Sequence, residues 1–262
     1  MASASGLEAI VLGAIQGLTE FLPVSSSAHL VITPWLMNWD DPGLAFDVAL
    51  HLGTLVALIV YYWKEWLTLG ASLFSSDRKS RHLLFMLIVA SVPGAIIGLL
   101  FEKEAETVFR APALIAVALA ALGVALWFSD RAMPQSRSMT EITFGDALLI
   151  GLSQAFAIFP GVSRSGATIT MARLLRVKRE DAANFSFLMA APIIAGAGLV
   201  EGRHLAHSID LAVVFGFTAA AIFGLIAIAG LVRFVRTRTY EPFAWYRVLA
   251  GAFVIAVVIL RG

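Results

Sequence analysis

Two short polar stretches of this apolar chain carry the side chains that could do chemistry. Residues 16–29 read QGLTEFLPVSSSAH and contain a carboxylate, three serine hydroxyls and an imidazole. Residues 160–168 read PGVSRSGAT and contain a guanidinium among hydroxyls and small residues. Carboxylates, hydroxyls and imidazoles activate nucleophiles and transfer protons, and a guanidinium fork binds phosphate oxygens. Together the two stretches favour hydrolysis of a phosphate ester or anhydride.

The first stretch is predicted to be a helix, a break and a second helix. Gln16 and Glu20 are four residues apart and share one helical face, and Pro23 ends that helix. The second helix opens with Ser25, Ser26 and Ser27, and His29 falls in its first turns. As structural alternatives, Glu20 could pair only with His29 or could lie among lipid headgroups. An unpaired carboxylate inside a bilayer costs roughly 2.5 kcal/mol or more, which favours a functional role.

The second stretch is predicted to be an anion-binding helix start. Pro160 and Gly161 end one helix, and Ser163 is a candidate N-cap of the next. A helix N-terminus presents unpaired N–H groups and a positive dipole end. The residues around this helix start are small, carry hydroxyls or, at Arg164, carry a guanidinium that can bind a phosphate through two nitrogens. They are Gly161, Ser163, Arg164, Ser165, Gly166, Ala167 and Thr168. The alternative is a structural cap whose Arg164 extends to the membrane interface.

The two stretches belong to one segment that occurs twice. Residues 12–32 match residues 150–170 without a gap, 138 positions later. The shared positions are Gly13, Gln16, Phe21, Val24, Ser25 and Ser27, which fall on Gly151, Gln154, Phe159, Val162, Ser163 and Ser165. A duplicated break in an apolar chain indicates a polar site inside a membrane, built by both halves.

Composition and hydropathy predict an integral membrane protein. The chain is 59% hydrophobic and 14% charged, whereas an ordinary soluble domain is about a quarter charged. Apolar stretches long enough to cross a bilayer lie at 44–63, 83–101, 111–129, 182–200, 211–232 and 243–260. The duplicated segments, with short apolar runs on both sides of a break, suit re-entrant hairpins instead. We therefore predict an all-α polytopic fold with about six transmembrane helices and two re-entrant helix-break-helix hairpins.

The order of these elements predicts an inverted-topology repeat within one integral membrane domain, residues 1–262. Each half, approximately 7–129 and 142–260, has one hairpin and then three spans. Because three is an odd number, the second half enters the membrane in the opposite orientation. Most Lys and Arg fall on one predicted side, which the positive-inside rule makes cytoplasmic. The opposite side has only Lys103, Arg110, Arg203 and Arg261. Both termini and the mouth of the first hairpin then face outward.

Other features narrow the chemistry. Asp47 and His51, one helical turn apart in the span at 44–63, could line the same cavity or form a structural polar pair. The chain has no cysteine, so a bound metal would use oxygen and nitrogen ligands. No segment resembles a basic nucleic-acid-binding patch.

The two polar stretches resemble the signatures of the bacterial undecaprenyl-diphosphatase family, also called bacitracin-resistance proteins. QGLTEFLPVSSSAH is similar to its (E/Q)xxxE motif, and PGVSRSGAT to its PGxSRSxxT motif. FDVALHLGT (46–54) and NFSFLMAAP (184–192) are secondary matches. The resemblance implies a phosphatase of the bacterial cytoplasmic (inner) membrane that removes one phosphate from undecaprenyl diphosphate. This reaction regenerates the lipid carrier for peptidoglycan and other envelope polymers and explains the family's link to bacitracin resistance.

By motif position, the resemblance also assigns residues to the site. Gln16, Glu20, Ser25, Ser26 and His29 fall in the first signature, and Gly161, Ser163, Arg164, Ser165 and Thr168 fall in the second. We expect catalytic roles for Glu20, Ser26, His29 and Arg164, and substrate-binding roles for Gln16, Ser25, Ser27, Gly161, Ser163, Ser165 and Thr168. The divalent cation usual in the family, Mg²⁺ or Ca²⁺, would bind at Glu20 with Gln16, although Gln16 cannot ionise. We expect His29 to act as base and then acid, and Ser26 to be the nucleophile or a phosphate ligand.

A transporter is the main alternative, because broken helices at mid-membrane are characteristic of secondary transporters. Such a protein would flip a phosphorylated isoprenoid lipid, but transport alone does not require a serine, a histidine and a glutamate together. The expected partners are a long-chain isoprenoid diphosphate lipid and the bilayer. The sequence leaves the oligomeric state open, with a homodimer as one candidate.

Overall fold

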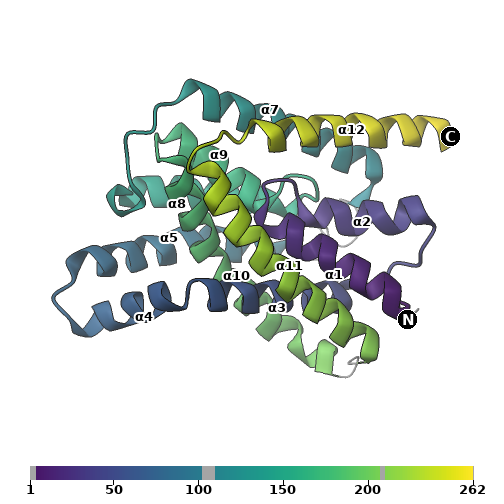
Figure 1. Cartoon of the computed structure of the whole chain (residues 1–262), viewed down its shortest axis with the longest axis horizontal. Helices are drawn as coiled ribbons and strands as arrows, with labels where there is room; N and C mark the ends of the chain where they lie inside the picture. The colour runs from purple at the N-terminus through teal and green to yellow at the C-terminus, as the bar shows by residue number, and fades with distance from the viewer. Residues whose placement is uncertain (1–3, 102–109, 207–209, 262) are drawn as a thin grey trace.

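The computed structural model describes residues 4–101, 110–206 and 210–261, and it consists of α-helices joined by short turns (Figure 1). The first half contains α1 (Gly6–Phe21), α2 (Ser26–Met37), α3 (Leu44–Tyr61), α4 (Trp63–Ala71), α5 (Arg78–Leu100) and α7 (Pro112–Ala132). The second half contains α8 (Phe144–Ala155), α9 (Arg164–Leu174), α10 (Arg179–Ala206), α11 (Leu211–Val235) and α12 (Glu241–Arg261). The predicted all-α polytopic fold is confirmed.

In the part of the chain that the structure describes, five helices are long and apolar enough to cross a membrane, namely α5, α7, α10, α11 and α12. They coincide with five of the predicted spans. The sixth, near 44–63, differs, because α3 is followed by α4 after a bend of 71°. The bend falls at Tyr62, whose hydroxyl donates a hydrogen bond of 2.6 Å to Asn184 Oδ1 on α10. Tyr62 is thus tied to a neighbouring helix at the point where α3 ends.

The hairpin of each half packs against the second span of the other half. Helix α1 lies along α11, and α8 lies along α5. Two glycines at equivalent repeat positions allow this contact: a Cβ at Gly13 would lie 2.2 Å from the Gly216 carbonyl oxygen, and a Cβ at Gly151 would lie 2.5 Å from that of Ala90. The exchange of partners brings the two helix breaks together. The repeat bounds at 7–129 and 142–260 and the opposite orientation of the halves stay predictions.

Both ends of the chain lie at the same end of the molecule, where α1 begins and α12 finishes (Figure 1). The predicted placement of both termini on the outer side of the membrane stays a prediction. Lys103, which entered the charge comparison, lies outside the described residues, as does the side chain of Arg203.

Candidate active site

The two helix breaks adopt the same local geometry. Ser25 caps α2 and Ser163 caps α9, and both have unusual positive φ angles, 77° and 69°. The Ser25 hydroxyl accepts from Ala28 N, and the Ser163 hydroxyl accepts from Gly166 N at 3.0 Å. The duplicated turn therefore folds the same way twice, and the predicted N-cap at Ser163 is confirmed.

Direct hydrogen bonds join one break to the other. The backbone N–H of Gly161 donates to Ser25 Oγ at 3.1 Å, and Ser165 Oγ donates to the Glu20 carbonyl oxygen at 3.1 Å. Gly161 has a φ of +100° and lies so close to α7 that a Cβ would be 2.5 Å from the Ile115 carbonyl oxygen. A side chain at this position would be strained and would also push the second break away from α7.

One fully buried arginine also bridges the breaks. Arg247 on α12 is 0% exposed and donates to the carbonyl oxygen of Pro23 at 3.0 Å. The same guanidinium donates to the carbonyl oxygens of Gly161 at 2.7 Å and Val162 at 2.9 Å. These carbonyls follow the ends of helices and have lost their helical partners. Arg247 therefore satisfies both breaks with one side chain.

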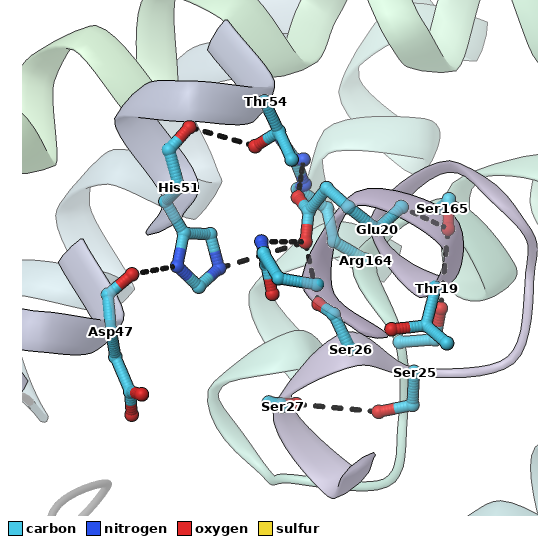
Figure 2. A network of polar contacts seen from close by, with 12 residues as sticks. Thr19, Glu20, Ser25, Ser26, Ser27, Asp47, His51, Thr54, Arg164 and Ser165 are labelled. Atoms are coloured by element: carbon cyan, nitrogen blue, oxygen red, sulfur yellow. Dashed lines mark hydrogen bonds and ion pairs between the residues drawn. The ribbon is translucent and has the colours of Figure 1, made fainter. Parts of the chain in front are cut away.

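The Glu20 carboxylate is the centre of a polar network (Figure 2). It forms an ion pair through Oε1 with Arg164, across the two hairpins. Its Oε2 accepts from Ser26 Oγ at 2.5 Å and from Gln16 Nε2 at 3.1 Å. His51 Nε2 lies 3.5 Å from the same oxygen. Because Glu20 is only 6% exposed, this network supplies the partners that water would otherwise provide.

A cavity of about 380 Å³ opens beside this network. Both halves line it, and the predicted site residues that reach it are Glu20, Ser26, Ser27, Ser163 and Arg164. The Nη1 atom of Arg164 has no hydrogen-bond partner among the described residues. The cavity thus has one polar side, formed by charged and hydroxyl side chains, and one largely aliphatic side.

Four predicted site residues do not line the cavity but contact the residues that do. Gln16 is buried and bonds Glu20, while the hydroxyls of Ser25 and Ser165 and the backbone of Gly161 hold the two breaks together. None of the four is among the cavity-lining residues. In this structure they position the lining side chains.

Two predicted site residues face other parts of the protein. Nδ1 of His29 lies 2.6 Å from the Ser25 carbonyl oxygen, and Nε2 lies 2.7 Å from Tyr246 Oη, against whose ring the imidazole stacks. The Thr168 hydroxyl bonds Ser186 Oγ on α10 at 2.7 Å. Neither residue lines the cavity. The roles predicted for His29 and Thr168 therefore stay predictions without a contact to the cavity.

The histidine that does line the cavity is His51, together with Asp47 one turn earlier on α3 (Figure 2). His51 Nδ1 lies 2.8 Å from the Asp47 backbone oxygen, which points Nε2 toward Glu20. Arg110 also lines the cavity. Its Nη2 atom lies 3.1 Å from Asp41 Oδ2 and 3.7 Å from Asp47 Oδ2. Of the two alternatives for Asp47 and His51, the structure supports the shared cavity.

Sequence reasoning missed three residues that the structure places at the site, one of which is Arg110 at the cavity. Arg247 lies inside an apolar span, and a cation at such a position was a signal that could have singled it out. Gln154 lines the cavity and is the repeat counterpart of Gln16, so the alignment of the two halves pointed to it.

The protein groups at the cavity do not by themselves make a divalent-cation site. Both oxygens of Glu20 are engaged by Arg164, Ser26 and Gln16. Within residues 4–101, 110–206 and 210–261, no three His, Cys, Asp or Glu side chains are grouped to hold a metal ion. A cation here would need oxygens from a bound phosphate, which hard cations such as Mg²⁺ accept readily.

The fold and the site define a class: a polytopic membrane protein whose two helix breaks enclose a buried carboxylate, a guanidinium and a serine. Residues 9–253 match the family described as bacitracin resistance protein BacA, and the chain belongs to that family. A protein of Moorella thermoacetica named undecaprenyl-diphosphatase is 50% identical over 97% of this chain and 98% of its own. Proteins with the same name from Pelotomaculum thermopropionicum (97% of each chain) and Desulforudis audaxviator (97% of this chain and 98% of its own) are 48% and 49% identical.

Proposed function

We propose that this chain hydrolyses undecaprenyl diphosphate to undecaprenyl phosphate and inorganic phosphate. The observation that carries the proposal is the meeting of Glu20, Ser26 and Arg164 at one cavity, in a chain whose relatives are named for this activity. The same cavity has the two surfaces that such a lipid requires, a polar end for the diphosphate and an aliphatic wall for the prenyl chain.

Binding of the diphosphate uses the second hairpin. Arg164 lines the cavity, its buried Nη1 atom has no partner among the described residues, and it begins α9, whose positive dipole end favours an anion. A phosphate oxygen at this nitrogen would gain a charge-assisted hydrogen bond. The same cation would offset the negative charge that spreads over the transferring phosphoryl group.

The chemical step uses the first hairpin. Ser26 Oγ already donates to Glu20, so Glu20 can take its proton as the oxygen attacks the terminal phosphorus. The new Oγ–P bond forms while the bridging P–O bond breaks, and undecaprenyl phosphate leaves with the electron pair. A water then attacks the phosphoserine and releases inorganic phosphate. In the other route, water attacks directly and Ser26 is a phosphate ligand.

His51 completes the proton pathway. Its Nε2 faces the Glu20 oxygen that bonds Ser26, and it lines the cavity from which water would enter. A proton taken by Glu20 can therefore pass to His51 and return during the second step. His29 would act more remotely, through the backbone of Ser25.

The location in the cell follows from the same proposal. The protein would span the bacterial cytoplasmic membrane, with both termini outside and the cavity open to the outer side, as the distribution of Lys and Arg predicts. There it would recycle the carrier lipid for peptidoglycan and other envelope polymers and confer bacitracin resistance. A homodimer stays a prediction, and transport of the lipid is not favoured because the relatives are named as a diphosphatase.

The cation expected from the resemblance is Mg²⁺ or Ca²⁺. Because both oxygens of Glu20 are paired, we propose that Glu20 would hold such a cation only together with oxygens of the bound diphosphate. The cation would supply charge neutralisation on the phosphates. The protein residues hold and orient the substrate in either case.

The test is phosphate release from undecaprenyl or farnesyl diphosphate by the purified protein in detergent, with Mg²⁺, Ca²⁺ or EDTA. Release by the wild type, lost in both Glu20→Ala and Arg164→Ala, is expected. No release from folded wild-type protein would refute the proposal. Detergent leaves no second compartment, so transport alone gives no signal.

A further inference from the structure

The side chain of Gln154 on α8 lines the cavity but bonds nothing in the described part of the chain. It is 3% exposed, and neither Nε2 nor Oε1 has a hydrogen-bond partner there. Its repeat counterpart, Gln16, donates its amide to Glu20 at 3.1 Å. A buried amide without partners is costly, so a group that fills the cavity is expected to complete it.

Gln154 stands on the apolar wall of the cavity. The described lining residues contributed by α5, α8, α10 and the short 3-10 turn Phe156–Ile158 are otherwise glycines, alanines and isoleucines, such as Gly94 and Ile193. The ionisable lining residues come from α1, α3, Arg110 and the start of α9. Gln154 is thus the polar side chain that these elements contribute to the described lining of the cavity.

Gly94 on α5 makes room for this amide. A Cβ at Gly94 would lie 2.2 Å from Gln154 Nε2 and 2.9 Å from Cδ. Any side chain at this position would displace the end of Gln154 rather than the backbone. The absence of a side chain at Gly94 therefore leaves the space that the amide of Gln154 occupies.

From this arrangement we propose that Gln154 binds the phosphate that stays attached to the prenyl chain. The inference rests on the proposed diphosphatase function and adds a ligand contact to it. The amide N–H₂ donates to the oxygens of this inner phosphate, while Arg164 and Ser26 act on the terminal one. Because substrate and lipid product share the inner phosphate, Gln154 contributes equally to binding both.

Kinetics of Gln154→Leu test the proposal in detergent with farnesyl diphosphate. A hydrogen bond to a charged group contributes enough that KM should rise roughly 10-fold or more. The turnover number should stay within about 3-fold, because a contact equal in ground and transition states affects binding only. Inhibition by farnesyl monophosphate should weaken by the same factor as KM, and inhibition by inorganic phosphate should not change.

Gly94→Ala provides a second variant that leaves the amide in place but moves it. It should reproduce the KM effect, and it should add little in the Gln154→Leu background, because both changes remove one contact. Thr170→Val is the matched control: its hydroxyl is also buried without a described partner but does not line the cavity. Gly230→Ala, with open space around it, controls for a glycine substitution in a spanning helix.

The outcomes separate the two claims. If folded Gln154→Leu has the same KM and the same inhibition by farnesyl monophosphate as the wild type, the role of Gln154 is overturned while the diphosphatase function stands. If Gln154→Leu does not fold, the same result in Gly94→Ala overturns it equally. An inactive wild type would refute the proposed function itself.

Discussion

Glu20 and Arg164, 144 residues apart in the chain, form an ion pair between the ends of two helices that belong to different halves of the protein. Both side chains are largely buried, at 5% and 14% exposed, and both line the same cavity. A buried charge of either sign without a partner would be unfavourable, so the ion pair stabilises both side chains in their ionised forms. The pair also keeps a phosphate-binding cation beside the hydroxyl of Ser26.

Replacing Arg164 by lysine should lower phosphate release by about 100-fold or more, because an ammonium cannot pair with Glu20 and a phosphate through two separate nitrogens. Turnover of a prenyl diphosphate in detergent measures the effect. Arg261→Lys is the control, since Arg261 is exposed and lies at the far end of α12. Near-normal turnover in Arg164→Lys would remove Arg164 from the mechanism.

Ser26→Ala should abolish turnover, whereas Ser27→Ala should keep a substantial part of it. Both hydroxyls line the cavity, but only that of Ser26 bonds the Glu20 carboxylate. Rapid acid quenching followed by mass spectrometry should find phosphate on Ser26 in the wild type. Absence of phosphoserine together with an active Ser26→Ala enzyme would instead support direct attack by water.

His51→Gln should lower the turnover number by about 10-fold or more, the typical contribution of a positioned acid–base group. Tyr246→Phe removes the partner of His29 Nε2 and should leave turnover within about 3-fold, since His29 does not reach the cavity. Steady-state rates of the two variants compare the two histidines. A large loss in Tyr246→Phe with an active His51→Gln would return the acid–base role to His29.

Arg247→Met should reduce the stability of the protein in detergent by about 3 kcal/mol or more, because it leaves the carbonyl oxygens of Pro23, Gly161 and Val162 buried and unpaired. Unfolding monitored by circular dichroism gives the difference. In the matched control, Arg261→Met, the lost partners are the carbonyls of Trp35 and Leu36 at an exposed site. Equal stabilities for the two variants would contradict a bridging role of Arg247.

Gly13→Ala and Gly151→Ala should each destabilise the protein by about 1–3 kcal/mol, the cost of overpacking, because the new methyl group meets a backbone carbonyl of a neighbouring helix. Gly70→Ala is the control: it has open space around it and should be neutral or stabilise α4 by up to about 1 kcal/mol. Thermal unfolding in detergent compares the three. If neither Gly13→Ala nor Gly151→Ala changed the stability, the close approach of α1 to α11 and of α8 to α5 would not be needed for the stability of the fold.

Local sequence signals found the helix breaks and most of the spans. Ser163 was recognisable as an N-cap because it follows the break at Pro160 and Gly161, and the structure confirms it and places Ser25 in the same role at the first break. The span at 44–63 was less accurate, since the helix bends at Tyr62, whose hydroxyl donates a hydrogen bond to Asn184, far along the chain. No local pattern around Tyr62 contains that partner.

The sequence by itself determined the class of protein, the duplicated helix breaks and the residue types at the site, because these depend on hydropathy, helix ends and motif spacing. Only the tertiary structure decided which side chains share the cavity. It turned His29 toward Tyr246 and Thr168 toward Ser186, and it brought His51 and Gln154 to the cavity. The physical reason is that the direction of a side chain depends on how its helix is rotated against its neighbours. That rotation is set by contacts between distant segments, such as Gly13 against Gly216 and Gly94 against Gln154.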